Sequence, residues 1–239
     1  MIDRILARAT QTTDPLEPRT SLVIGAAVLV ITWSPLGYTL VRHLVTLVHE
    51  AGHAMVAVLM GRRLAGIRLH SDTSGLTVSK GRPRGFGMVM TLLAGYPAPA
   101  IVGLLGALVL GAGHAGGLLW GFLVACVLML LLVRNLYGLW VVLVTGAVLF
   151  AAMAWAPEDL FVGIAHALVW SLLLAAPRSV VELQRERRRR RTSSDADQLA
   201  RLTRIPAVIW ITLFWLVCVA ALLLAATQLL DVWPLAEVL

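Results

Sequence analysis

The sequence predicts an all-α polytopic membrane protein with about seven transmembrane helices and a small cytoplasmic β-hairpin. Of its 239 residues, 59% are hydrophobic and 14% are charged, and the mean hydropathy of +0.85 is too high for a soluble domain. Seven apolar segments have about the length of a helix that spans a bilayer. The basic residues fall mostly in short stretches beside these segments, as the positive-inside rule predicts for cytoplasmic loops.

Short polar, basic or glycine-containing stretches separate the apolar segments along the chain. Ser34-Pro35 lies between the first two segments, and because proline interrupts helical hydrogen bonding, these two could form one kinked unit. The predicted spans are 21–36, 38–60, 86–110, 117–133, 136–155, 160–176 and 206–230.

Residues 61–85 are the one stretch in which apolar and polar residues alternate with a period of two. Ile67 and Leu69 alternate with polar neighbours, and Leu76 and Val78 do so again after a turn rich in serine, threonine, aspartate and glycine. This pattern predicts a β-hairpin, and its exposed edge could pair with an extended substrate strand. A plain basic loop is the alternative.

The distribution of charge predicts the membrane topology. With a cytoplasmic N-terminus and alternating spans, nearly every arginine falls on the cytoplasmic side, an agreement that requires an odd number of spans. Residues 1–20 carry charges without an apolar core, so we expect a cytoplasmic segment rather than a cleaved signal peptide. A transmembrane core (21–176), a basic cytoplasmic loop (177–205) and a C-terminal helix with a tail (206–239) follow.

The net charge of +7 and the pI of 10.6 do not indicate a nucleic-acid-binding protein. The dense run Arg185–Arg191 has no interleaved aromatic residues, so we expect it to bind anionic lipid headgroups. Cys126 and Cys218 lie in apolar segments and are expected to be small hydrophobic residues. Nineteen arginines against one lysine, with much alanine, leucine and valine, indicate a bacterial cell-membrane protein from a GC-rich genome.

The strongest functional signal is His49-Glu50-Ala51-Gly52-His53, within the second apolar segment. On a helix, the two histidines lie one turn apart on the same face, where both imidazoles can bind one metal ion. Glu50 can then act as general base toward a water activated by that metal. Ionisable groups are costly inside a membrane, which favours a functional site over packing histidines with Glu50 paired to Arg42.

The sequence His49-Glu50-Ala51-Gly52-His53-Ala54 resembles the zinc motif of the site-2 protease family of intramembrane metallopeptidases, in its compact bacterial branch. The similarity continues through Gly61, Ser74-Gly75-Leu76-Thr77 and Ala94-Gly95-Tyr96-Pro97, and it covers most of the chain. The resemblance implies one zinc ion per chain and cleavage of membrane-embedded or membrane-proximal protein substrates.

The third zinc ligand departs from the pattern of that family, which commonly uses an aspartate in an L-D-G-type motif preceded by N-L-x-P. Asn135-Leu136-Tyr137-Gly138 matches the asparagine part, but Val144-Thr145-Gly146 has no aspartate. We predict Asp195 as the third ligand, with Asp197 as an alternative and simple helix capping as a competing role. Asn135 is expected to bind substrate or the oxyanion rather than zinc.

These observations predict an intramembrane zinc endopeptidase with Glu50 as its catalytic base and His49, His53 and Asp195 as its metal ligands. Two alternatives remain open. One is a non-catalytic membrane protein of the same fold that binds a substrate or partner. The other is a metal transporter, although the chain shows neither an inverted repeat nor several midplane ligands.

Overall fold

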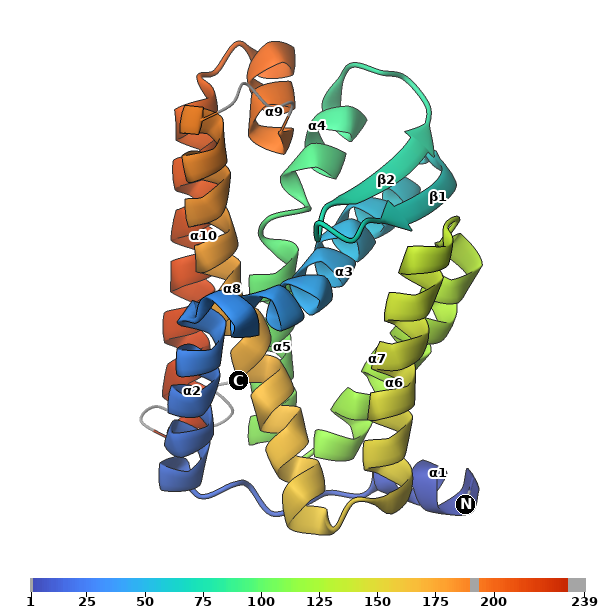
Figure 1. The fold of residues 1–239 in the computed structure, drawn as a ribbon, viewed down its shortest axis with the longest axis vertical. Helices are drawn as coiled ribbons and strands as arrows, with labels where there is room; N and C mark the ends of the chain where they lie inside the picture. Colours follow the sequence, from blue (N-terminus) through green and yellow to red (C-terminus); the bar gives the residue numbers. More distant parts are fainter. Residues whose placement is uncertain (1, 190–193, 232–239) are drawn as a thin grey trace.

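The computed structural model describes residues 2–189 and 194–231, as an assembly of helices with one small sheet (Figure 1). The strands are β1 (Arg63–Leu69) and β2 (Gly75–Lys80). The helices are α1 (Ile2–Thr10), α2 (Pro18–Trp33), α3 (Pro35–Leu59), α4 (Phe86–Leu93), α5 (Ala98–Gly111), α6 (Ala115–Leu132), α7 (Leu136–Trp155), α8 (Glu158–Arg189), α9 (Asp195–Thr203) and α10 (Ala207–Leu229).

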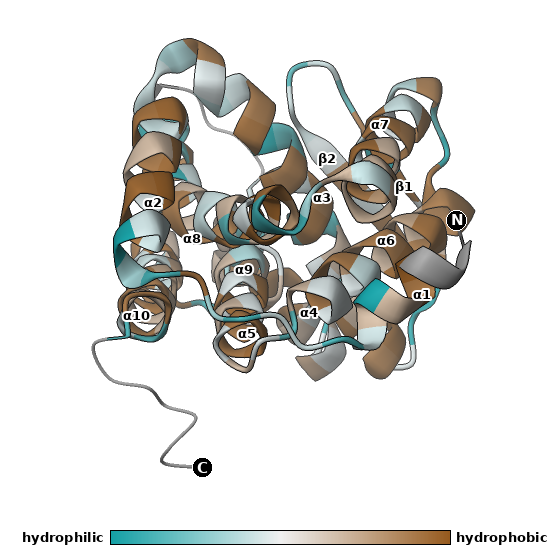
Figure 2. Cartoon of the chain, turned by 90° about the horizontal axis from the view of Figure 1, so that it is seen from below, coloured by the Kyte–Doolittle hydropathy of each residue, from teal (hydrophilic) through white to brown (hydrophobic). Residues whose placement is uncertain are grey.

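Four of the described helices, α6, α7, α8 and α10, are long and apolar enough to cross a membrane. Two bent pairs, α2 with α3 and α4 with α5, raise this number to six if each pair forms one span. Their outward faces are strongly apolar, as Figure 2 shows for α5 and α10, with exposed Leu105, Leu213 and Leu216. The chain is therefore a multi-pass membrane protein, but the predicted count of seven spans is not confirmed.

The bend of 102° between α2 and α3 explains most of this difference. Pro35 is the first residue of α3, where its missing N–H costs little, and the Ser34 hydroxyl accepts a hydrogen bond from the Gly37 N–H at 3.0 Å. A second bend, of 63°, separates α4 from α5 at residues 94–97. The structure is thus compatible with the single kinked unit, in which α2 and α3 together form one broken span.

The N-terminal segment and the hairpin lie at opposite ends of the molecule (Figure 1). The Arg8 guanidinium donates to the Met153 and Ala156 carbonyls at 2.9 and 2.7 Å, at the end of α7, and Thr13 N–H donates to the Gly113 carbonyl. Hence residues 2–20 lie beside the turn between α5 and α6 and the turn between α7 and α8. The segment 1–20 and the hairpin cannot both be cytoplasmic if the helices between them span the membrane.

Helix α8 differs from the expected boundary at residue 176, because it continues through Pro177 to Arg189. Most of the predicted basic loop 177–205 is therefore helical, with 177–189 in α8 and Asp195–Thr203 in α9. The helix packs against α2, α5 and α10, and its residues Phe161, Val169 and Leu173 are fully buried. The hydrophobic core of the bundle therefore continues along this helix toward the end of the molecule where the hairpin lies.

The predicted hairpin is present as two antiparallel strands, with Leu69 opposite Gly75 and Ile67 opposite Thr77. An irregularity between Leu64 and Gly66 places Gly66 at a φ of 145°, a conformation that glycine adopts readily. The outer edge of β1 is covered, because the Arg134 N–H donates to the Ile67 carbonyl at 2.9 Å. The hairpin is therefore held against the junction between α6 and α7.

Candidate metal centre

Helix α3 places His49 and His53 one turn apart, facing the same point. Their Nε2 atoms are 3.0 Å apart, and Asp195 Oδ2 lies 3.4 Å from His49 Nε2 and 3.1 Å from His53 Nε2. Zinc bonds of ~2.0–2.1 Å in tetrahedral geometry separate ligand atoms by roughly 3.3 Å, so these spacings fit one such ion. Two imidazoles with one carboxylate are also the ligand set of several catalytic zinc sites, which keep one position open.

The tautomer of His53 in its neutral, metal-binding form follows from its hydrogen bond to α4. Its Nδ1 lies 2.7 Å from the Thr91 carbonyl oxygen, which can only accept, so Nδ1 carries the hydrogen. The lone pair of the neutral ring is then on Nε2, facing His49 and Asp195. A backbone contact of this kind fixes the orientation of a metal-binding imidazole.

Asp195 reaches the histidines from α9, which is far from α3 in the sequence. Ser194 caps this helix, in a reciprocal pair of hydrogen bonds with Asp197. The Arg187 guanidinium also contacts Asp197, at 2.9 Å. Asp197 is thus engaged in capping and in an ion pair, whereas the Asp195 carboxylate faces the histidines. Of the two acids weighed from the sequence, the structure brings only Asp195 to the site.

The charge of Asp195 suits a metal ligand. Burial opposes its ionisation, but when the histidines are protonated, the positive charge of His53 and hydrogen bonds from both histidines outweigh this and hold the pKa of the carboxyl below its usual range. The carboxyl is therefore ionised at neutral pH, as coordination requires.

Glu50 is buried, with 3% of its surface exposed, and strand β2 contacts it directly. The Thr77 hydroxyl donates to Glu50 Oε2 at 2.5 Å and lies 3.1 Å from the Glu50 carbonyl oxygen. A Cβ atom on Gly75 would lie 2.3 Å from Glu50 Oε1, so only glycine permits this approach of the strand. In the sequence, both residues belong to the stretch that carries the family resemblance, but no local pattern there indicates a contact with Glu50.

The break between α4 and α5 brings backbone against the two histidines. A Cβ atom on Gly95 would lie 2.4 Å from His53 Nε2 and 2.6 Å from His49 Cε1. The Tyr96 ring stands edge-on to the His49 ring, with 4.8 Å between centroids, and stacks on Phe214 of α10. This broken segment therefore forms one wall of the site.

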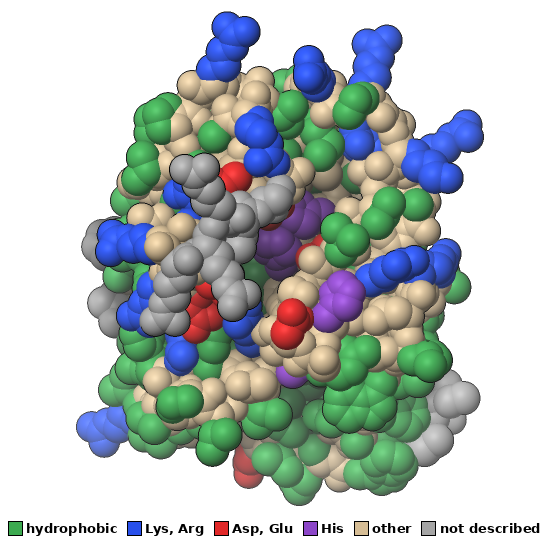
Figure 3. Space-filling view, turned by 45° about the horizontal axis from the view of Figure 1, so that its top comes forward, with side chains coloured by type: hydrophobic (Ala, Val, Ile, Leu, Met, Phe, Trp, Pro, Cys, Tyr) green, Lys and Arg blue, Asp and Glu red, His purple; other side chains and the backbone are tan. Residues whose placement is uncertain are grey.

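His49, His53, Asp195 and Glu50 line a cavity of about 350 Å³. In Figure 3, histidine side chains lie in a hollow at the end of the molecule that carries the hairpin, with basic residues around it. One wall consists of Gly75, Thr77 and neighbouring residues of β2. The cavity has room for water beside the histidines.

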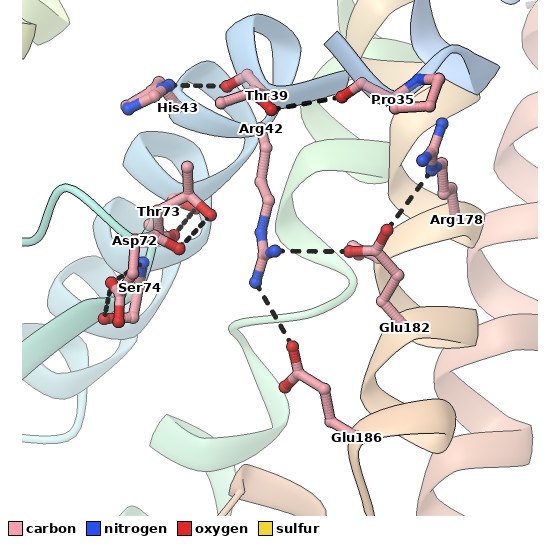
Figure 4. A network of polar contacts seen from close by, with 12 residues as sticks. Pro35, Thr39, Arg42, His43, Asp72, Thr73, Ser74, Arg178, Glu182 and Glu186 are labelled. Atoms are coloured by element: carbon pink, nitrogen blue, oxygen red, sulfur yellow. Dashed lines mark hydrogen bonds and ion pairs between the residues drawn. The ribbon is translucent and has the colours of Figure 1, made fainter. Parts of the chain in front are cut away.

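A network of ion pairs joins α3 to α8 at the side of this cavity (Figure 4). The Arg42 guanidinium lies 3.5 Å from Glu182 and 3.7 Å from Glu186, and Arg178 lies 3.5 Å from Glu182. The Arg178 guanidinium also stands 3.7 Å above the centre of the Tyr38 ring. Arg42 therefore pairs with α8, not with Glu50.

Asn135 does not lie in the cavity. Its side-chain amide donates to the Leu69 carbonyl at 2.6 Å, and its Oδ1 accepts from the Leu69 N–H at 3.2 Å. Both groups are engaged by the edge of β1, so this placement does not match the predicted role in binding substrate or the oxyanion. The side chain instead attaches the hairpin to the start of α7.

A multi-pass membrane protein with a partly buried His-His-Asp cluster beside the Glu50 carboxylate defines a candidate membrane metallopeptidase. The family model described as Peptidase M50B-like matches residues 22–225, and the chain belongs to this family. This match confirms the resemblance to the site-2 protease family. Comparisons with curated proteins and with solved structures give no match.

Proposed function

We propose that the protein is an intramembrane zinc endopeptidase that hydrolyses membrane-embedded or membrane-proximal protein substrates. The proposal rests on one observation, the convergence of His49, His53 and Asp195 ligand atoms within 4.8 Å of one another. Glu50 lines the same cavity from the same helix. The family supports a peptidase, and the His-His-carboxylate set favours zinc over harder cations, which prefer oxygen ligands.

Zinc bound at this site would supply Lewis-acid activation of a water molecule. The Glu50 carboxylate then takes the proton of the attacking water and returns it to the leaving amine, so the peptide bond breaks without a covalent intermediate. The hydrogen bond from Thr77 holds Glu50 Oε2 in place during both transfers. Burial of Glu50 and His53 limits competing water around the reacting groups.

The outer edge of β2 is suited to hold the substrate in an extended conformation. The His70 N–H donates to the Ser74 carbonyl, so in the alternating antiparallel ladder the backbone groups of Gly75 and Thr77 point away from β1. Gly75 and Thr77 also line the cavity that contains Glu50. A substrate segment can thus add to the sheet as a third strand and place its peptide bond beside the candidate metal centre.

The hairpin end of the molecule is proposed to face the cytoplasm. It carries most of the described basic residues, whereas residues 1–20, at the other end, contain only Arg4, Arg8 and Arg19. The N-terminus is then on the opposite side of the membrane from the hairpin, which replaces the expected cytoplasmic N-terminus. The cavity opens toward the cytoplasm in this orientation.

Two variants test the proposal, with metal content and peptide cleavage measured on the purified, reconstituted chain. Glu50→Gln should retain about one zinc per chain and lose at least about a hundredfold in cleavage rate. Asp195→Asn should lose most of its zinc as well as its activity, because a neutral amide is a poor zinc ligand.

Wild-type protein without bound zinc would contradict the proposal. Zinc-loaded protein that cleaves no membrane substrate would support the non-catalytic alternative, and zinc flux into liposomes would support a transporter.

A further inference from the structure

A groove of about 380 Å³ runs between α8 and α10, on the outside of the bundle and apart from the metal centre. The two helices lie side by side and are antiparallel (Figure 1). Along α8 the groove is lined at spacings of three, four and seven residues, which places the side chains on one face of the helix. These residues are Val181, Gln184, Arg185 and Arg188, and Val180 also contributes to the lining.

Helix α10 presents a second stripe with the same spacing. Trp215 is 41% exposed and Val208 is 53% exposed, so this side of the groove is open at the outer surface. Exposed apolar residues next to it, including Leu213 and Leu216, belong to a surface that faces lipid. The lining residues of α10 are Val208, Ile211, Thr212 and Trp215.

The groove has a polar end and an apolar end. Arg185 and Arg188 lie toward the C-terminus of α8, at the hairpin end of the molecule, and neither has an acidic partner among the described residues. Val181 is about 10 Å deeper in the span, at 1.5 Å per residue, and Trp215 lies on α10 at the deep end. A phospholipid has the same arrangement, with a charged headgroup at one end that can contact the arginines and acyl chains at the other that can contact the apolar residues.

Gln184 supplies an independent observation. Its side-chain Oε1 is buried and has no hydrogen-bond partner within the described part of the chain. A buried acceptor without a donor is unfavourable, and in this groove the donor can come from a bound molecule. A hydroxyl of a lipid headgroup or glycerol moiety meets this requirement.

We propose that this groove is a binding site for one anionic phospholipid, with its phosphate held by Arg185 and Arg188 and the start of an acyl chain against Val181, Ile211 and Trp215. Basic pockets between transmembrane helices on the cytoplasmic side bind anionic headgroups in this way. The basic run as a whole is expected to be attracted to the membrane surface. The proposed site is more specific, because it holds one lipid at a defined position between two helices. It does not depend on catalysis.

The experiment measures lipid retained by purified protein, by native mass spectrometry, after exchange into detergent with phosphatidylglycerol or phosphatidylcholine as the probe. The wild-type chain should retain about one phosphatidylglycerol in clear preference to phosphatidylcholine. Replacing both Arg185→Gln and Arg188→Gln should reduce that retention at least about fivefold. The matched control, Arg82→Gln with Arg84→Gln, removes the same charge from the hairpin end outside the groove and should retain lipid as the wild type does.

A groove-filling variant separates shape from charge. Val181→Trp keeps both arginines but occupies the apolar part of the groove, and it should also lose phosphatidylglycerol. Equal retention by the groove and control double variants would overturn the proposal, as would retention unchanged in Val181→Trp. Displacement of the lipid by soluble glycerol phosphate alone would also overturn it, because the acyl contacts would then contribute nothing.

Discussion

Thr77 is the residue that connects the hairpin to the chemistry of the site. Its hydroxyl donates to the Glu50 carboxylate, and hydrogen bonds to charged groups contribute about 1.5–3 kcal/mol. We predict that Thr77→Val lowers kcat for peptide cleavage by about tenfold or more while the zinc content stays unchanged. Thr77→Ser keeps the hydroxyl and should retain most of the activity. Equal kcat values for the two variants would exclude a role of this hydroxyl in positioning Glu50.

Gly95 is predicted to be essential for metal binding, although it supplies no ligand. An added methyl group would meet His53 Nε2 at 2.4 Å and His49 Cε1 at 2.6 Å, and both rings would have to move. Gly95→Ala should therefore weaken zinc binding by at least about tenfold, as measured by competition with a chelator. Gly121→Ala is the matched control, since a Cβ atom there has nothing within 4 Å. Unchanged zinc affinity in Gly95→Ala would contradict the observed packing.

The residues of the site differ in how far the sequence could predict them. His49, Glu50 and His53 lie on one helix, so a local motif places them together. Asp195 lies on another helix, and the sequence predicts it only as one of two acids that could replace the missing aspartate of the L-D-G-type motif. The contacts of Thr77 and Thr91 depend on long-range packing, of a strand in one case and of a backbone carbonyl in the other, and no local pattern reports these. Asn135 was assigned a different role because its partner, Leu69, is 66 residues away.

At the scale of the element, Arg8 links α1 to the C-terminus of α7. Its guanidinium donates to the carbonyls of Met153 and Ala156, which have no partners in the helix, and lies 4.9 Å from the centre of the Phe161 ring. We predict that Arg8→Gln lowers the free energy of unfolding by about 1–3 kcal/mol. The exposed Arg19 is the control, and Arg19→Gln should change stability by less than about 0.5 kcal/mol. Denaturant titration in detergent measures both, and equal effects would exclude the capping role.

Hydropathy located the apolar helices well but not their bends. The segments around 117–133, 136–155 and 206–230 correspond closely to α6, α7 and α10, because each is one uninterrupted apolar helix. A hydropathy profile does not show the direction in which a helix continues. The proline at Ser34-Pro35 therefore predicts a kink, but the profile does not show that a bend of 102° can reduce the number of spans. Likewise, the charged residues after Pro177 suggested a loop, although packing continues α8 to Arg189.

For the whole molecule, the span count determines which ends share a compartment. Six spans, with α2 and α3 as one, place the N-terminal segment opposite the hairpin, whereas seven would place them on the same side. Single cysteines at Thr12 and Ser71, both exposed, distinguish these cases when the buried Cys126 and Cys218 are replaced by alanine. In sealed, oriented vesicles, an impermeant thiol reagent should label Thr12→Cys and Ser71→Cys from opposite sides. Labelling of both from one side would rule out the six-span arrangement. It would also rule out the proposal that the cavity opens on the side of the membrane opposite the N-terminus.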